Sequence, residues 1–288
     1  MVPKRIGDFT LQWGESLRWD ERRQRLYFVD CATQTLHWLE GGEPPLHAMA
    51  LRSMPAGLVL AEDGRLVACL NDGLHVIDTD AGTTELLTTY PEGMHGRAND
   101  ANADGSGNLV TGTLNIVPGP GASWWYSHAD GWKLLDDDIG NANGPLVIDV
   151  AGQSTLIFGD TSAGAVYAYP YDGEQGTIGP RRVFGDHKGL GGVPDGATAD
   201  SGGGVWSCVL QSGKIARFTA EGLDRVVDLP MANPSDVVFG GEAMDRLYVV
   251  SIAFDLGLSA APATEDGWLL SIEGLGVVGR PEARFRLA

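Results

Sequence analysis

The sequence is poor in cysteine and has no long apolar run. Among its 288 residues are 3 cysteines, Cys31, Cys69 and Cys208, each in a separate apolar stretch. Their odd number and their spacing favour buried free thiols over a disulfide framework or a zinc site, and free thiols favour a reducing compartment. No run of about 18 apolar residues occurs, and the N-terminal residues carry no apolar signal core. We therefore expect a soluble, cytoplasmic protein that does not contact a membrane.

Basic residues are also scarce. The chain has 20 Lys and Arg against 38 Asp and Glu, which gives a formal net charge of −18. Binding to a phosphate backbone needs clustered Lys and Arg, so nucleic acid is not an expected partner. An acidic surface is compatible with divalent cations. The Gly-x-Ser-x-Gly motif is absent and none of the 6 histidines is spaced to pair with a Ser or Cys, which argues against a nucleophilic triad.

Glycine, in contrast, is abundant, and one strand pattern recurs. The 41 glycines show no collagen-like period and 43% of the residues are hydrophobic, as in a turn-rich globular protein. A short apolar strand, an Asp/Gly turn, a second apolar strand and a more polar outer strand follow one another six times, at intervals of about 40–50 residues. The six copies begin near residues 17, 56, 99, 144, 195 and 235.

Six such copies predict an all-β, six-bladed β-propeller that occupies residues 1–288 as a single domain. A sandwich does not need six near-equivalent copies, and no amphipathic helix period of useful length interrupts them. The innermost strands of a propeller surround a central channel. Residues at the beginnings of these strands therefore converge at one end of the channel, although they lie far apart in the sequence.

Unusual polar residues occur where four of these innermost strands begin. They are Glu15 in the first copy, Arg97 and Asn99 in the third, Asn143 in the fourth and Asp195 in the fifth. Carboxylate and amide oxygens are hard donors that suit Ca²⁺, Mg²⁺ or Mn²⁺. Each residue alone is compatible with an ordinary turn or strand end. Their joint occurrence at equivalent points predicts a single site at the channel mouth.

The local sequence around two of these residues is typical of turns. Pro194 fixes φ and Gly196 tolerates positive φ, so the backbone at Asp195 is predicted to turn. Asn143 and Gly144 form a dipeptide common in tight turns. Residues 100–105 match the opening of an EF-hand loop, but the twelfth position is Thr111 instead of Glu and no helices flank it, so we predict a hairpin turn at 104–107. We interpret His95 and His187, near the mouth, as solvated loop residues.

At these residues the chain resembles the gluconolactonase family, which includes regucalcin (senescence marker protein) and the luciferin-regenerating enzyme. Four motifs carry the resemblance in order, and a fifth resembles the last blade of the family. They are Gly14-Glu15-Ser16, Arg97-Ala98-Asn99-Asp100 with Gly112-Thr113, Asn143-Gly144, Pro194-Asp195-Gly196 and Asn233-Pro234-Ser235-Asp236. The resemblance covers nearly the whole chain.

The resemblance implies a six-bladed propeller with one divalent metal ion in its central channel. Glu15, Asn143 and Asp195 would hold the metal, while Arg97 and Asn99 would bind substrate oxygens. Asp195 would also act as the general base. The implied ion is Ca²⁺ first, with Mn²⁺, Zn²⁺, Mg²⁺ and Fe²⁺ as the other candidates.

The implied function is that of a metal-dependent lactonase, which opens a sugar-type (aldono)lactone to its hydroxy acid while Asp195 activates water. Some family members carry a Glu shortly after the Gly-Thr pair, where this chain has the uncharged residues 114–117, so the sequence leaves the lactone open. Two other functions remain open: a related metal-dependent esterase or organophosphate hydrolase, and a non-catalytic calcium-binding propeller. The sequence does not define the oligomeric state.

Overall fold

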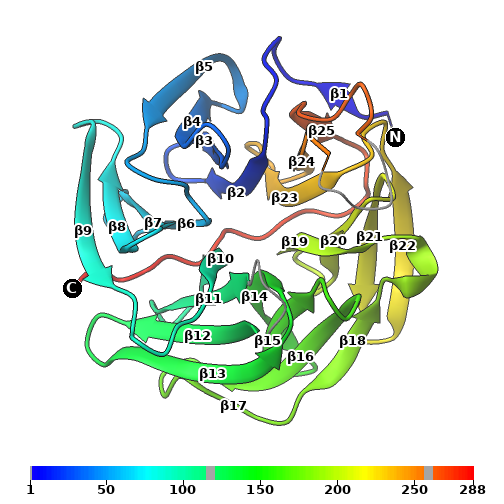
Figure 1. Ribbon diagram of the computed structural model, residues 1–288. Helices are drawn as coiled ribbons and strands as arrows, with labels where there is room; N and C mark the ends of the chain where they lie inside the picture. The colour runs from blue at the N-terminus through cyan, green and yellow to red at the C-terminus, as the bar shows by residue number, and fades with distance from the viewer. Residues whose placement is uncertain (1, 115–120, 256–261) are drawn as a thin grey trace.

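The strands of this computed structural model form six antiparallel sheets arranged as blades around one axis (Figure 1). The structure describes residues 2–114, 121–255 and 262–288. Within these residues each sheet has its innermost strand at the channel, and its other strands follow outward. The predicted six-bladed β-propeller is confirmed.

The first five blades each use one continuous stretch of chain, with the innermost strand first. Blade one contains β2 (Gly14–Asp20), β3 (Arg25–Asp30), β4 (Thr35–Glu40) and β5 (Glu43–Ala50); blade two contains β6 (Gly57–Leu60), β7 (Leu66–Leu70), β8 (Gly73–Asp78) and β9 (Thr83–Thr89). Blade three contains β10 (Arg97–Ala103), β11 (Leu109–Leu114), β12 (Gly121–Ser127) and β13 (Gly131–Ile139). Blade four contains β14 (Ala142–Val150), β15 (Gln153–Asp160), β16 (Ala165–Asp172), β17 (Thr177–Ile178) and β18 (Arg182–Asp186). The 3₁₀ turn η1 (Lys188–Leu190) leads to blade five. Blade five contains β19 (Val193–Ala199), β20 (Val205–Leu210), β21 (Lys214–Thr219) and β22 (Gly222–Asp228).

Blade six joins the two ends of the described chain. Its strands β23 (Pro234–Gly240), β24 (Arg246–Ser251) and β25 (Leu270–Ile272) come from the last copy of the pattern, and its outer strand is β1 (Lys4–Arg5). Lys4 lies opposite Ser271, and Arg5 lies opposite Leu270. The N-terminal strand therefore closes the ring by backbone hydrogen bonds, which the sequence analysis did not predict.

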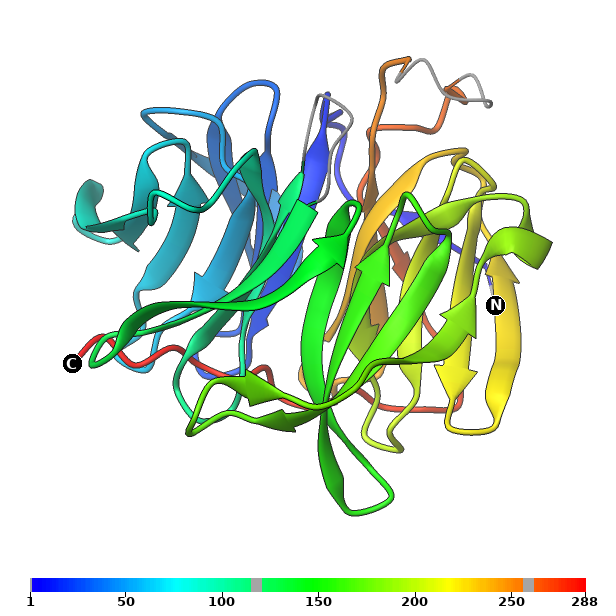
Figure 2. The same ribbon diagram turned by 60° about the horizontal axis from the view of Figure 1, so that its bottom comes forward.

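A C-terminal tail, residues 275–288, crosses the axis after blade six. It is the red segment that runs between the blades in Figure 1 and along the lower side in Figure 2. The tail forms bridges to the hairpin turns of two blades, Gly279 with Asp200 and Phe285 with Ala61. We call this end of the channel the floor, and the opposite end, where the innermost strands begin, the mouth.

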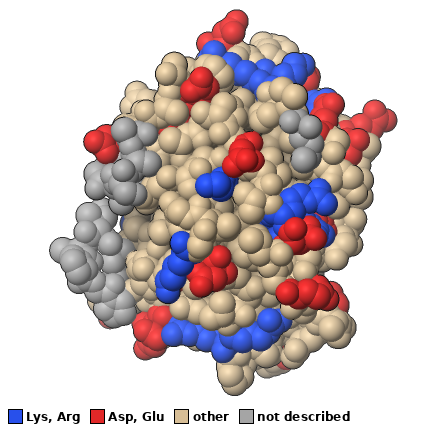
Figure 3. Space-filling view, turned by 90° about the vertical axis from the view of Figure 1, so that its right-hand side faces the viewer, with Lys and Arg blue, Asp and Glu red and all other residues tan. Residues whose placement is uncertain are grey.

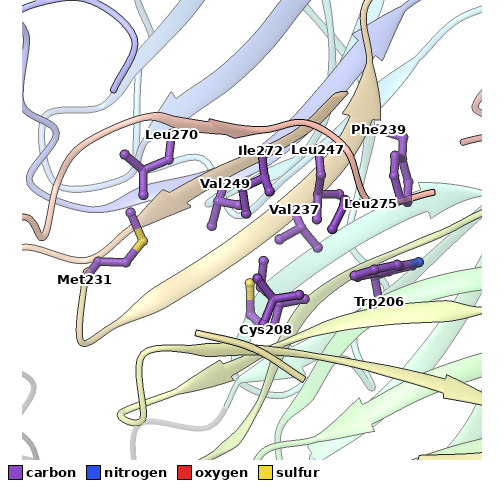
Figure 4. Packing of buried hydrophobic residues seen from close by; sticks show 12 residues of the cluster. Trp206, Cys208, Met231, Val237, Phe239, Leu247, Val249, Leu270, Ile272 and Leu275 are labelled. Carbon is purple, nitrogen blue, oxygen red and sulfur yellow. The ribbon is translucent and has the colours of Figure 1, made fainter. Parts of the chain in front are cut away.

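Apolar clusters fill the space between each pair of adjacent blades. Figure 4 shows the cluster between blades five and six, where Trp206 and Cys208 of β20 face Val237 and Phe239 of β23. Burying one such large side chain contributes about 1.5–3 kcal/mol, so these clusters fix the blades against one another. The three cysteines are free and buried, as predicted.

The surface carries charges of both signs. On the side shown in Figure 3, basic side chains lie in short groups with acidic side chains beside them. Within the part of the chain that the structure describes, no helix has the length and apolarity needed to cross a membrane.

Candidate functional site

A β-bulge interrupts the innermost strand of five blades just inside the mouth. In β2 the pairing skips from Glu15 to Arg18, and in β10 it skips from Asn99 to Ala101. The strands β14, β19 and β23 shift register after Asn143, Pro194 and Pro234 in the same way. A bulge re-aims the side chains beside it. The repeated bulges therefore account for the equivalent placement of Glu15, Asn99, Asn143 and Asp195.

Left-handed backbone conformations accompany three of the bulges. Ser16 has φ +54°, Asp100 has φ +48° and Gly144 has φ +55°. Non-glycine residues seldom adopt this region, so its use at Ser16 and Asp100 marks local strain, which is common at functional sites. Asp100 also secures the next bulge, because its Oδ2 accepts the Gly144 N–H at 2.9 Å.

Aspartates at the ends of the second strands hold the chain that leads into the mouth. Asp30 accepts the backbone N–H of Gln12 at 2.8 Å and that of Trp13 at 3.2 Å. Asp160 does the same for Gly140 at 3.1 Å and Asn141 at 3.3 Å. These bonds satisfy backbone donors outside the sheet ladder and fix where β2 and β14 begin.

Amide and hydroxyl groups connect three blades at the mouth. The Asn99 side chain donates to Asn143 Oδ1 at 2.6 Å, and Asn143 Nδ2 donates to Thr161 Oγ1 at 2.7 Å. Thr161 in turn donates to the Pro194 carbonyl at 2.9 Å, next to Asp195. A continuous hydrogen-bond chain thus links Asn99 of blade three and Asn143 of blade four to the backbone of blade five beside Asp195. Asn143 and Asp195 are 7% and 5% exposed.

The first blade contributes Glu15 and an aromatic side chain beside it. Trp13 Nε1 donates to Glu15 Oε1 at 3.0 Å. The Arg97 guanidinium lies 5.5 Å from the centre of the Trp13 ring and donates to Asn99 Oδ1 at 3.1 Å. Phe254 packs edge-on against Trp13, with ring centroids 5.4 Å apart. The structure therefore brings all five predicted site residues to the mouth and adds Trp13 and Phe254.

Burial disfavours ionisation of the two candidate carboxyl groups in the metal-free protein. It raises the pKa of Glu15 to about 8, an effect that the Trp13 N–H opposes and the charge of Asp100 reinforces. Burial likewise raises the pKa of Asp195 well above its ordinary value, and the negative charges of Glu15, Asp236 and Asp100 raise it further. A nearby cation would favour the ionised form of both groups.

Arg18 fills the channel below the mouth. Its guanidinium donates to the Leu58 carbonyl at 2.7 Å and lies 3.3 Å from Asp100 Oδ1. Arg18 Nη1 also lies 3.8 Å from Oδ2 of Asp236 in β23 and 3.9 Å from Oε1 of Glu282 in the tail. The sequence analysis did not single out Arg18. Its place between Leu17 and Trp19, in a strand that is otherwise largely apolar, was the available signal.

Three interpretations made from the sequence need correction. Residues 193–199 form the strand β19, and 142–150 form β14, so neither Asp195 nor Asn143 lies in a turn. Gly196 is needed for space, because a Cβ there would lie 2.1 Å from Asp236 Oδ1. His187 is fully buried against Phe218 and is not solvated, whereas His95 is exposed as predicted. Of the uncharged segment 114–117, residues 115–117 lie outside the described residues.

The donor set at the mouth fits a divalent cation. Within residues 2–114, 121–255 and 262–288, no three Asp, Glu, His or Cys side chains are arranged to hold a metal ion. The candidate set contains two carboxylates, and the third ligand would be the amide oxygen of Asn143. The buried carboxyl of Asp195 and the half-buried carboxyl of Glu15 repel each other when both are ionised, and a cation held by these hard oxygen donors would relieve that repulsion.

The fold is that of the SMP-30/gluconolactonase/LRE class of propellers. The model for the SMP-30/Gluconolactonase/LRE-like region matches residues 13–253. This match spans well over half of the sequence, so the chain belongs to that family. The resemblance noted from the sequence motifs is confirmed.

Two curated relatives and one solved structure are similar over most of the chain. Pentonolactonase XacC of Haloferax volcanii is 28% identical and covers 99% of this chain and 98% of its own length. The 6-deoxy-6-sulfogluconolactonase of Pseudomonas putida is 31% identical and covers 83% of this chain and 82% of its own. A solved luciferin-regenerating enzyme superposes with a TM-score of 0.89 at 25% identity and covers 99% of both chains. Both curated names denote lactone hydrolases.

Proposed function

We propose that the protein is a metal-dependent lactonase that opens a sugar-type lactone to its hydroxy acid. The observation that carries the proposal is the convergence of Glu15, Asn143 and Asp195 at one mouth, beside Arg97 and Asn99. The first set consists of hard oxygen donors for a divalent ion, with Ca²⁺ ahead of Mn²⁺, Zn²⁺, Mg²⁺ and Fe²⁺. The second set offers hydrogen-bond donors for substrate oxygens. The curated relatives with lactonase names support the reaction class.

The residues divide the hydrolysis between them. When bound, a divalent ion would supply Lewis-acid polarisation of the lactone carbonyl. Asp195 accepts a proton from the attacking water, whose oxygen forms the new bond to the carbonyl carbon. As the ring C–O bond breaks, Asp195 returns the proton to the leaving ring oxygen. Arg97 donates hydrogen bonds that orient the lactone, and Asn99 joins it by releasing one of its two N–H groups from the Ala142 carbonyl or Asn143 Oδ1.

A related esterase or organophosphate hydrolase is the second candidate. It is favoured by the aromatic side of the mouth, where Trp13 and the partly exposed Phe254 pack together. An aromatic surface of this kind suits an apolar ester better than a sugar lactone. The two candidates share the same ligands and differ in substrate class.

A substrate panel with controlled metal content tests the proposal. Metal-stripped protein and protein supplied with Ca²⁺, Mn²⁺, Zn²⁺, Mg²⁺ or Fe²⁺ are assayed for acid release from sugar lactones, aliphatic lactones, aryl esters and organophosphates. The spontaneous opening of each lactone is subtracted at each pH. We expect metal-restored hydrolysis of sugar lactones. Activity confined to esters or organophosphates supports the second candidate, and metal binding without any turnover supports a non-catalytic calcium-binding propeller.

Removing either candidate carboxylate should abolish turnover. Asp195→Ala and Glu15→Ala are each expected to lower kcat/KM by at least about 100-fold, because the general base or a ligand is lost. Circular dichroism checks that the fold is kept. Asp137→Ala, which removes an exposed carboxylate from β13, is the matched control and should retain full activity. Full activity of Asp195→Ala after metal stripping would remove this site from consideration.

A further inference from the structure

We propose that Trp13 is a positioning residue that joins the metal-binding and substrate-binding halves of the mouth. Its indole N–H sets the orientation of the Glu15 carboxylate, and its ring face supports the Arg97 guanidinium. The inference rests on the proposed function and deepens it, because it names the side chain that couples a metal ligand to a substrate-binding residue.

The contact with Glu15 orients a metal ligand. Trp13 Nε1 lies 3.0 Å from Glu15 Oε1, a normal hydrogen-bond distance. Indole N–H is a donor only, so this contact leaves the other carboxylate oxygen free to face the channel. Outer hydrogen bonds of this kind fix the direction of a ligating carboxylate, and their loss typically weakens metal affinity 10- to 100-fold.

The Trp13 ring supports the Arg97 guanidinium, which has no carboxylate partner among the described residues. The guanidinium lies 5.5 Å from the Trp13 ring centre, within the range of a cation–π interaction. Its hydrogen bond to Asn99 Oδ1, at 3.1 Å, uses one of its five N–H groups. Within the described part of the chain, no carboxylate lies at salt-bridge distance from Arg97. Ring support and the Asn99 bond therefore hold the guanidinium while leaving donors for a substrate.

Trp13 is itself fixed from three directions, as a positioning residue must be. Its backbone N–H donates to Asp30 Oδ1 at 3.2 Å, and its carbonyl accepts the Cys31 N–H at 2.8 Å. Trp13 also bridges to Ile252 of blade six, and Phe254 packs against the ring at an interplanar angle of 73°. The ring is half-buried. Its place is set by the fold and does not depend on Glu15 or Arg97.

Two substitutions separate the two contacts. Trp13→Phe keeps an aromatic face for Arg97 but removes the N–H, and Trp13→Leu removes both. Calorimetric titration of the metal-stripped proteins with Ca²⁺ and Mn²⁺ measures metal Kd, and kinetics at saturating metal measure KM. We expect Trp13→Phe to raise metal Kd about 10-fold or more with KM within about twofold of the parent. Trp13→Leu should raise metal Kd equally and also raise KM several-fold.

Trp132→Phe is the matched control. It removes an indole N–H that donates to the Thr89 carbonyl at 3.0 Å in the outer strands of the propeller, away from the mouth, so metal Kd should stay within about twofold of the parent. Circular dichroism and thermal unfolding verify each fold. If Trp13→Phe does not fold, Trp13→Leu tests the Glu15 contact, because it also lacks a hydrogen-bond donor.

The outcomes distinguish the inference from the function on which it rests. An unchanged metal Kd in Trp13→Phe, with normal metal binding by the parent, overturns the coupling alone. Equal KM values for Trp13→Phe and Trp13→Leu overturn the support of Arg97. A parent that hydrolyses lactones without binding any divalent metal overturns the metal dependence and this inference together.

Discussion

Arg18 gives the lower channel a permanent cation. Its guanidinium faces Asp100, Asp236 and Glu282 and is only 3% exposed. One positive charge faces three carboxylates there, and Glu15 and Asp195 add further acidic groups above it. The carboxylates of the channel therefore outnumber its cations. That imbalance favours a divalent ion at the mouth.

Arg97 should affect substrate binding and not metal binding. Arg97→Ala removes charge-assisted hydrogen bonds worth about 1.5–3 kcal/mol, so we expect kcat/KM to fall roughly 10- to 100-fold through KM. Metal content at saturation, measured by atomic absorption, should be unchanged. Arg22→Ala removes an exposed arginine and serves as the control. Loss of the metal in Arg97→Ala would contradict the role assigned to this residue.

At the residue scale, the sequence predicted which side chains lie at the mouth, but not the packing contacts that constrain their neighbours. Glu15, Asn143 and Asp195 were found because unusual polar residues recur where the inner strands begin. The role of Gly196 could not be found in this way, since the atom that requires it belongs to Asp236, 40 residues away in another blade. Such packing constraints follow from closing the ring and leave no local pattern.

At the scale of elements, the apolar inner strands were predictable and the two chain ends were not. Short apolar runs and recurring Asp/Gly turns marked the strands of all six blades. The strand β1 has two residues, both basic, and shows no alternation. The tail is largely irregular and pairs with turns that lie together only after folding. Both ends therefore depend on tertiary contacts, on which local propensity carries no information.

Glu282 of the tail should make stability depend on pH. Burial raises its pKa to about 7 from 4.5, although Arg18 and the Trp19 N–H oppose the rise. A raised folded-state pKa means that the native state binds the proton more tightly. The contribution is therefore fully present below pH 4.5 and is lost as pH rises toward 7. Glu282→Gln should gain up to about 3 kcal/mol over the parent between pH 5 and pH 8.

Urea unfolding at the two pH values, with chelator present, measures this difference. The exposed Glu242 lies in the turn before β24, and Glu242→Gln provides the control. It should change the unfolding free energy by less than about 0.5 kcal/mol at both values. A Glu282→Gln variant whose advantage over the parent is the same at pH 5 and pH 8 would contradict the predicted titration.

At the scale of the whole molecule, the net charge of −18 should weaken the fold at low ionic strength. Salt screens repulsion beyond a Debye length of about 10 Å at 0.1 M. Raising NaCl from about 10 mM to about 300 mM, with chelator present, should therefore raise the Tm measured by circular dichroism. KCl should give the same shift. A falling Tm would mean that surface pairs such as Arg25–Glu40 and Arg246–Glu43 outweigh the repulsion.

The tail that crosses the floor also determines which end of the channel substrate and product can use. Arg18 and Asp236 above it are nearly inaccessible, so among the described residues the tail closes this end of the channel. Under the proposed reaction, the hydroxy acid leaves by the path along which the lactone arrived, and its new carboxylate passes Arg97 on the way. Departing product and arriving substrate then compete for the same opening. Accumulated acid therefore slows turnover as a competitive inhibitor, a property set by the closed end of the ring.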